Sequence, residues 1–434
     1  MLSSMQDIFA AHMPAYAQLR PLHPREQRAA WCISRCYTAA MGSSVWRCPA
    51  GHFERVQFHA CRHRSCPRCA EAPRQRWIAQ ELQRLLPCPH FHVVFTLPHS
   101  LLPLWEFNRA ALAQLLFDCA RQSLLQLLAD PRHLGAVPGI LMALHTWGRT
   151  LSHHPHVHCL VSAGGLSPEQ AWRPCRAGFL LPLKPLQALF RGKLLARLWK
   201  LASSGRLALP PRQALAHWRA VVCGLYRRHW NIQINPPYAH GRGVALYLAR
   251  YAKGGPCPKS RPLYDNDGRI TMPYTDHRDG QRKRLQLSTD EFISRVLWHA
   301  APRGQHTTRH AGLYASAQRV QHTCARIALG ESATLTWRPT PNSTLNQPPT
   351  PEPTCPHCSA PLLRFTYPAR PHRYSEFSVA PGRGAPTAAH LGPTGRSNGH
   401  SKAGVCRAPP PEAIIGSARQ TPAFECRSTQ RSNA

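Results

Sequence analysis

The sequence predicts an α+β protein in three parts: a small Cys/His-rich region, a middle with a sheet and long helices, and a low-complexity tail. Three observations support this. Cys and His gather at short spacings within residues 1–86. Strand-like and helix-like hydrophobic patterns alternate across residues 87–330. In residues 331–434, Pro, Thr, Ser, Gly and Arg dominate and the periodicity disappears, which is typical of a linker and a mostly disordered tail.

The middle region contains the clearest predicted elements. Phe91–Leu97 has the composition of a strand and is closed by Pro98. Arg109–Leu128 has apolar residues at helical spacing. Gly139–Trp147 and His156–Ser162 are two further predicted strands, and the short turn between them favours a hairpin. Other expected elements are helices near 73–86, 186–200, 213–230, 243–253 and 289–300, and strands near 269–274 and 282–287.

The charge of the chain indicates a nucleic-acid partner. Its 434 residues include 54 Lys and Arg against 20 Asp and Glu, which leaves a formal net charge of +34. Such a field attracts polyanions, and DNA or RNA is the usual one. A protein that merely coats nucleic acid would share this feature, so the charge predicts the class of partner and no chemistry.

We expect the chain to act in the cytoplasm and not in a membrane. Met1–Ala11 lacks the basic start and apolar run of a signal peptide. No stretch approaches the roughly 20 apolar residues of a membrane span. Cytosolic thiols stay reduced, so clusters among the 17 Cys are interpreted first as metal ligands.

His156 and His158 form the most informative pair. Residues i and i+2 of a strand point to the same face, about 6–7 Å apart. Two imidazoles so placed can bind one divalent ion. A third ligand should come from a neighbouring strand, and His145 is the candidate. A chance pair on a polar strand face is the alternative.

Tyr247 and Tyr251 stand at positions i and i+4 of the predicted short helix and therefore share one face. A tyrosine can attack a DNA phosphate to form a phosphotyrosine, which conserves the bond energy for resealing. Because a free phenol has a pKa of about 10, a nearby cation must favour the phenolate. An aromatic pair packed in the core is the alternative interpretation.

The N-terminal cluster predicts a zinc site. The spacing of Cys66 and Cys69 is that of a zinc knuckle. The expected ligands are Cys48, Cys61, Cys66 and Cys69, with His52 next and Cys36 and His63 as further candidates. Five arginines of the same segment could grip phosphates or could form a solvated face. They are Arg62, Arg64, Arg68, Arg74 and Arg76.

Cys355 and Cys358 look like half of a zinc ribbon within the tail. Its other half is not evident from the sequence, because Cys406 and Cys426 lie in low-complexity surroundings.

Together, the motifs resemble those of HUH endonucleases. His154–Val161, followed by Gly164–Leu166, resembles their metal motif, and Tyr247–Tyr251 resembles the paired-tyrosine motif. Their order and separation point to the two-tyrosine rolling-circle transposases of insertion-sequence-ninety-one type, with an N-terminal zinc-binding domain. The likeness covers roughly residues 15–330. Further matching segments are Phe91–Pro98, His145–Arg149, Phe292–Arg295, Pro302–Gly304 and His310–Tyr314.

The resemblance implies a fold and a chemistry. The implied fold is an antiparallel sheet flanked by helices. The implied enzyme is a bacterial, nucleoid-associated transposase that nicks and rejoins single-stranded DNA without a nucleotide cofactor. Tyr247 and Tyr251 would be nucleophiles that carry the 5′ phosphate, and His156 and His158 would bind magnesium or manganese. Zinc would occupy the N-terminal domain.

Three other functions compete with this interpretation. A replication initiator with the same nicking chemistry has equivalent catalytic motifs, but the zinc region favours the transposase. A non-catalytic zinc-dependent DNA-binding protein would not need Tyr247 and Tyr251 on one helical face. A carboxylate-triad transposase ranks low, because the 20 acidic residues form no evident ordered triad.

Overall fold

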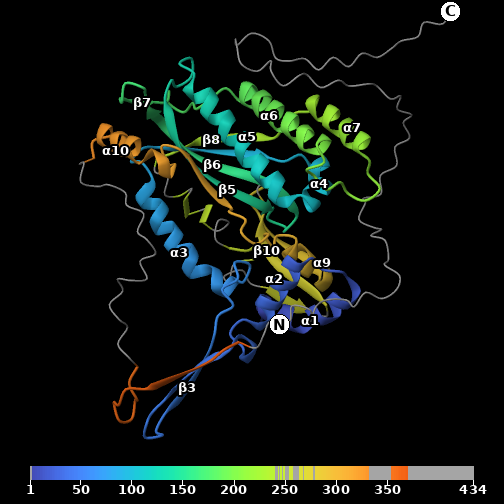
Figure 1. Cartoon of the computed structure of the whole chain (residues 1–434), viewed down its shortest axis with the longest axis vertical. Helices are drawn as coiled ribbons and strands as arrows, with labels where there is room; N and C mark the ends of the chain where they lie inside the picture. The colour runs from blue at the N-terminus through green and yellow to red at the C-terminus, as the bar shows by residue number, and fades with distance from the viewer. Residues whose placement is uncertain are drawn as a thin grey trace, which may run out of the picture.

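The computed structural model describes residues 2–239, 243, 245–246, 248–249, 254–257, 263–266, 268–276, 279–331 and 353–369. Helices and strands alternate along most of this length (Figure 1). The helices are α1 (Met5–Leu19), α2 (Pro24–Arg35), α3 (Pro67–Arg84), α4 (Leu102–Phe107), α5 (Arg109–Ala129), α6 (Leu183–Ser203), α7 (Leu215–Tyr226), α9 (Thr289–Leu297) and α10 (Arg319–Ala328). The strands are β1 (Leu2–Ser3), β2 (Ser43–Arg47), β3 (Glu54–Phe58), β4 (His90–Thr96), β5 (Val137–Trp147), β6 (His153–Leu166), β7 (Trp172–Pro174), β8 (Ile232–Tyr238), β9 (Leu263–Asn266), β10 (Arg269–Thr275), β11 (Arg282–Ser288), β12 (Thr308–Gly312) and β13 (Leu363–Tyr367).

The largest sheet has the strand order β12-β5-β6-β4-β8, with β7 paired to the end of β6. Its pairings are antiparallel. Strands β4, β5 and β6 lie where hydrophobic runs predict them, and β5 and β6 form the expected hairpin. The predicted α+β class, with an antiparallel sheet flanked by helices, is confirmed.

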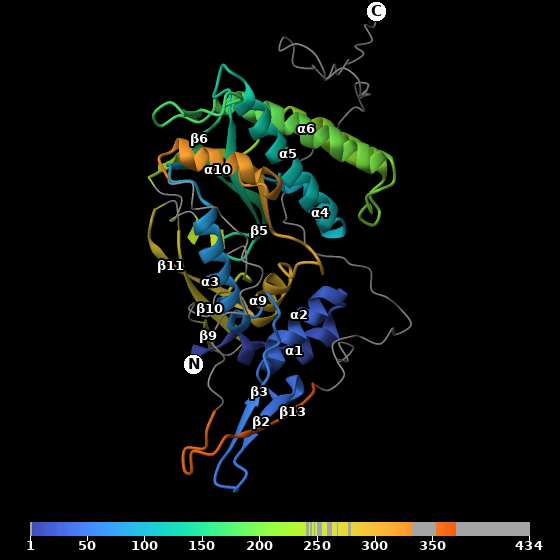
Figure 2. The same ribbon diagram turned by 60° about the vertical axis from the view of Figure 1, so that its left-hand side comes forward.

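The two faces of this sheet have different partners. Phe91, Val93 and Phe95 of β4 point to the face covered by α5, α6 and α7, where the largest hydrophobic core lies. On the opposite face, Leu141 and Leu160 pack against residues of α3 and α10. Figures 1 and 2 show the helices on the two sides of the sheet.

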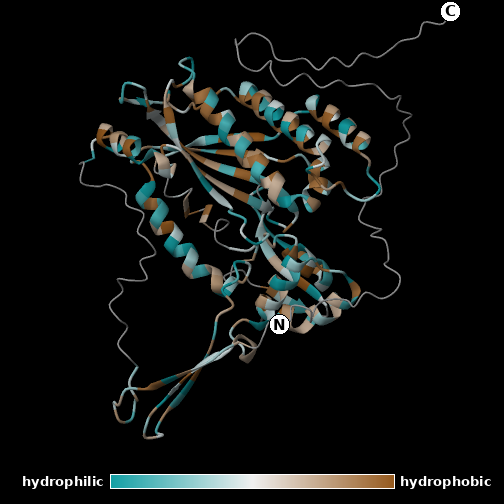
Figure 3. Ribbon diagram, in the orientation of Figure 1, coloured by the Kyte–Doolittle hydropathy of each residue, from teal (hydrophilic) through white to brown (hydrophobic). Residues whose placement is uncertain are grey.

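Hydropathy follows this layering (Figure 3). Strands of the large sheet carry hydrophobic stretches with hydrophilic residues among them, and α5, α6 and α7 also carry residues of both kinds. This is the pattern of strands buried on both faces and of helices with one face in water.

A second core joins the N-terminus to a distant part of the chain. Helices α1 and α2 pack with α9 and with the sheet of order β1-β9-β10-β11. Phe9, Ile33, Ile270 and Phe292 are all fully buried in this core. Residues before position 36 and residues after position 263 therefore depend on one another for burial, as the neighbouring blue and yellow ribbons show (Figure 2).

A third sheet, of order β13-β2-β3, extends away from the two larger bodies (Figure 1). In this sheet, the hairpin of β2 and β3 pairs with residues 363–367. From composition, these residues fall in the predicted low-complexity tail. Residues 353–369 are thus an ordered exception within the predicted tail. The rest of the tail after residue 369 lies outside the described residues.

None of the helices in the described part of the chain is sufficiently long and apolar to cross a membrane.

Candidate metal centres and active site

Three histidines converge on the face of the large sheet that α3 and α10 cover. His145 on β5 lies directly across from His156 on β6, and His158 follows two residues along. The ring centroids of His145 and His158 are 3.9 Å apart, and those of His156 and His158 are 4.6 Å apart. One ligand nitrogen from each residue lies within 4.8 Å of the other two. The structure therefore brings together the three histidines that the sequence nominated.

Burial keeps these imidazoles neutral. It lowers the pKa of His156 to about 3 and holds the pKa values of His145 and His158 well below the usual range. The Nδ1 of His156 donates to the carbonyl oxygen of His154 at 2.5 Å, which leaves Nε2 with a lone pair. A neutral ring with one nitrogen held in this way is the form that binds a metal ion.

A fourth histidine, His92 of β4, extends this group, and the sequence reasoning missed it. Its Nε2 is 2.7 Å from the Nδ1 of His158, and its Nδ1 contacts the side-chain amide of Asn235 at 3.1 Å. His92 sits inside an apolar run that predicts a core strand. Pairing the predicted strand that carries His92 with the strand that carries His156 and His158 could have identified it. In that pairing, His92 lies opposite Leu160, two residues from His158.

The two predicted tyrosines, Tyr247 and Tyr251, lie outside the described residues. Their neighbours Leu248 and Ala249 are described, are helical, and are fully buried. These two residues pack with Leu141 and Leu160, on the same side of the sheet as the three histidines.

The segment after this helix contacts the N-terminal region. Gly255 approaches Ser65 so closely that a Cβ on it would lie 3.0 Å from the Ser65 carbonyl oxygen. Cys257 is buried in the same core as Cys66. The positions between the predicted tyrosines thus pack on the large sheet, and the positions after them contact the N-terminal region.

The cysteines do not form the single group that the sequence predicted. Cys36, Cys61, Cys66 and Cys69 come together, with Sγ atoms of Cys69 at 3.4 Å from Cys36 and 3.6 Å from Cys61. Cys48 and His52 lie elsewhere, with Cys355 and Cys358. The expected grouping of Cys48 with Cys61, Cys66 and Cys69 is therefore wrong, because Cys36 at the end of α2 takes its place.

His63, a further candidate ligand, lies beside the first cysteine group but outside it. Its ring Nδ1 accepts a hydrogen bond from the backbone N–H of Ser65, and the backbone N–H of His63 donates to the Cys61 sulfur. It orients the loop that carries the ligands.

The five predicted DNA-binding arginines fall into two sets. Arg64 and Arg74 are partly buried and bonded within the protein, Arg64 to the Thr307 hydroxyl at 2.9 Å and Arg74 to Glu71 at 2.5 Å. The other three arginines are exposed, and they are Arg62, Arg68 and Arg76. Arg68, although exposed, also donates to the side-chain oxygen of Gln6 at 3.0 Å and lies over the ring of Tyr37.

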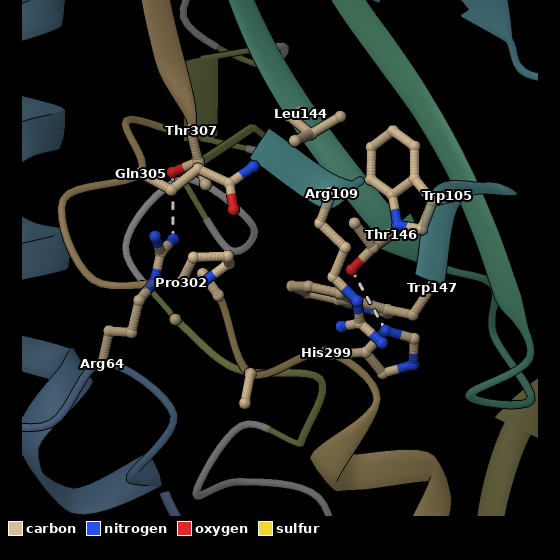
Figure 4. Close-up of a pocket in the computed structure, with 13 residues that line it drawn as sticks. Arg64, Trp105, Arg109, Leu144, Thr146, Trp147, His299, Pro302, Gln305 and Thr307 are labelled. Atoms are coloured by element: carbon tan, nitrogen blue, oxygen red, sulfur yellow. Dashed lines mark hydrogen bonds between the residues drawn. The ribbon is translucent and has the colours of Figure 1, made fainter. Parts of the chain in front are cut away.

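Arg64 also lines a small cavity, together with Thr146 and Trp147 of β5 and with His299 (Figure 4). Its volume is about 30 Å³, room for roughly one water. Within it His299 accepts from the Thr146 hydroxyl at 3.0 Å and donates to the Leu151 carbonyl at 3.1 Å. Among the described lining residues there is none of the three clustered histidines, so this cavity is separate from their site.

Comparisons with known proteins show which family the chain resembles. The family described as "Putative transposase" matches residues 139–321, and the family described as "Transposase zinc-binding domain" matches residues 8–97. A putative transposase, y4qJ, of Sinorhizobium fredii (strain NBRC 101917 / NGR234) is 38% identical over 325 residues, which cover 73% of this chain and 81% of that protein. The transposase for insertion sequence element IS801 of Pseudomonas savastanoi pv. phaseolicola is 32% identical over 290 residues, or 65% of this chain and 68% of that protein.

No solved structure matches the chain significantly. The clustered histidines, the cysteine groups and the two family matches define the class of protein, a transposase with an N-terminal zinc-binding domain. Within that class, the chain belongs to the IS91-like transposases.

Proposed function

We propose that this transposase nicks and rejoins single-stranded DNA at the ends of its element by tyrosine transesterification. Tyr247 and Tyr251 are the nucleophiles, and His145, His156 and His158 hold a divalent ion beside them. The observation that carries the proposal is the convergence of these buried, neutral histidines on one face of the sheet. Leu248 and Ala249, which lie between the two tyrosines in sequence, pack on that same face.

The reaction balances without an external energy source. The phenolic oxygen forms a bond to the phosphorus while the bond from phosphorus to the 3′ oxygen breaks. The phenol loses its proton, and the departing oxygen gains one to become a 3′-OH. The downstream strand stays attached through a 5′-phosphotyrosine, and attack by another 3′-OH reverses the step. A divalent ion, when bound, would polarise the phosphate and stabilise the charge of the transition state.

The donor set favours some metals over others. Three neutral imidazoles suit borderline transition metals, whereas magnesium prefers oxygen ligands. Of the two ions expected from the resemblance, manganese therefore fits His145, His156 and His158 better than magnesium. The clustered nitrogens leave further coordination positions for phosphate oxygens.

The protein's charge supports DNA as the substrate. A net charge of +34 attracts the phosphate backbone, and exposed Arg62, Arg68 and Arg76 lie near the first cysteine group. Gly255 and Cys257, just beyond the tyrosines in sequence, contact that same region. The zinc-binding region thus supports the tyrosine segment as well as contributing charge.

The test is capture of the covalent intermediate. Single-stranded DNA carrying an element end, labelled at its 3′ end, should form a protein adduct with manganese present. Tyr247→Phe combined with Tyr251→Phe should form none, because each change removes only a hydroxyl. Tyr238→Phe, an exposed tyrosine at the end of β8, is the matched control and should form adduct normally. An adduct that persists in the double variant would refute the assignment.

A further inference from the structure

A second group of metal-type ligands lies in the small three-stranded sheet, apart from both sites described above. Cys48 and His52 come from the turn between β2 and β3, and Cys355 and Cys358 come from the turn before β13. One ligand atom from each lies within 4.8 Å of the others. Cys358 and Cys48 are 310 positions apart in sequence, yet their sulfur atoms are 3.5 Å apart.

The spacing fits tetrahedral coordination. With zinc–sulfur bonds of about 2.3 Å, the sulfurs of a tetrahedral site lie about 3.8 Å apart. The Cys48 sulfur is 3.5 Å from the Cys358 sulfur and 3.9 Å from the Nδ1 of His52. A disulfide would need sulfurs at about 2.05 Å, so these cysteines are free thiols brought together without a covalent bond.

The two turns that carry the ligands are built alike. The backbone N–H of Cys48 donates to the carbonyl of Phe53, and that of Cys355 donates to the carbonyl of Ala360, each five residues on and each at 2.8 Å. Each turn contains a residue with positive φ, Gly51 in the first and Ser359 in the second. The N–H of His357 also points to the Cys355 sulfur at 3.4 Å, which stabilises a thiolate there.

The small sheet has too little apolar core to hold itself together. Among the described residues, its buried cluster consists of Cys48, Cys355 and Leu362, with Trp46 and Phe53 packed beside them. Every residue of β3 and of β13 is exposed. Units with so small a core usually require a metal or disulfides. Two of the three buried residues of that cluster, Cys48 and Cys355, are themselves candidate ligands.

We propose that Cys48, His52, Cys355 and Cys358 bind a structural zinc ion, second to the one held by Cys36, Cys61, Cys66 and Cys69. Four protein ligands complete a tetrahedral zinc shell and leave no position for substrate, so the site is structural. It fastens the N-terminal hairpin to β13. Because Cys355 and Cys358 lie outside residues 8–97, the site extends beyond the segment matched by the zinc-binding family.

Metal content of the purified full-length protein tests this directly, and it does not depend on the proposed nicking chemistry. The wild type should hold two zinc ions per chain by elemental analysis and native mass spectrometry. Cys355→Ser with Cys358→Ser should hold one, and so should Cys36→Ser with Cys61→Ser. His357→Ala is the matched control, because His357 lies between the two cysteines without joining the group, and it should keep two.

His52 offers a test that leaves every cysteine in place. His52→Ala should weaken the second site, and His52→Cys should restore a full zinc complement, because thiolate replaces imidazole in the same coordination shell. In cobalt-substituted protein, His52→Cys should also change the visible absorption of one ion only. If the Cys355 and Cys358 double variant keeps two zinc ions, or if wild type holds one ion or holds iron, the second zinc site is refuted.

Discussion

His92 on β4 places its Nε2 atom 2.7 Å from the Nδ1 atom of His158 on β6. The two rings are hydrogen-bonded to each other, and the outer hydrogen-bond partners of a metal-binding histidine tune its orientation and its metal affinity. We therefore predict that His92→Ala weakens manganese binding by roughly 10–100-fold. Calorimetric titration of the protein with manganese measures it. His92→Asn, which keeps a hydrogen-bonding side chain, should recover part of the affinity.

The control is His217→Ala, an exposed histidine on α7, which should bind manganese like wild type. Unchanged affinity in His92→Ala would show that the contact with His158 does not act on the metal.

The second prediction concerns the clustered histidines. His156→Ala with His158→Ala should reduce cleavage to background, because two of three expected ligands are lost. Binding to single-stranded DNA should be retained, since the exposed arginines are untouched. Zinc content should also be unchanged, because both cysteine groups remain. Cleavage and binding are measured on the same labelled oligonucleotide, and metal-dependent nicking by this variant would place the ion elsewhere.

The third prediction separates the two sets of arginines. Arg76→Ala should make the negative slope of log K against log salt shallower by about 0.7 for single-stranded DNA, the value expected for one lost phosphate contact. Arg64→Ala should instead lower stability, because Arg64 is partly buried and bonded to Thr307. Fluorescence binding at several salt concentrations and urea unfolding measure the two effects. The assignment fails if Arg64→Ala behaves as a DNA-contact variant of normal stability.

The fourth prediction concerns pH. Burial lowers the pKa of His299 to about 3, against about 6.5 in the unfolded chain. Between these values the unfolded state binds a proton that the folded state does not, so stability falls as pH drops below about 6.5. His299→Gln should therefore reduce the slope of unfolding free energy against pH by up to about 1.4 kcal/mol per unit. Urea unfolding from pH 7 to pH 4.5 measures it, and equal slopes would contradict it.

Short-range patterns in the sequence predicted the large sheet and its histidines well. The hairpin of β5 and β6 follows from two hydrophobic strands and a short turn, and it is this hairpin that sets His145 opposite His156. Two-residue periodicity then places His158 on the same face. These relations involve neighbours in sequence or directly paired strands, so local rules suffice.

Long-range relations could not be predicted in the same way. Cys36 lies 33 positions from Cys69, and nothing in its spacing indicates that α2 ends beside the knuckle. The partner of Cys355 lies near the other end of the chain, beyond the reach of any motif. The domain boundaries at residues 86 and 330 remain predictions. Phe9 and Phe292 lie in one hydrophobic core, so residues on the two sides of the boundary at residue 86 pack together.

The pairing of β2 with β13 has a consequence for how the protein is made. A ribosome releases Cys48 and His52 long before Cys355 and Cys358, so the hairpin emerges without half of its ligands and without its third strand. More than 350 of the 434 residues are therefore synthesised before this sheet can close. A chain cut short before residue 353 would retain the large sheet and its histidines, but the hairpin of β2 and β3 would lack its third strand and two of its four ligands. Such a chain should bind one zinc ion instead of two.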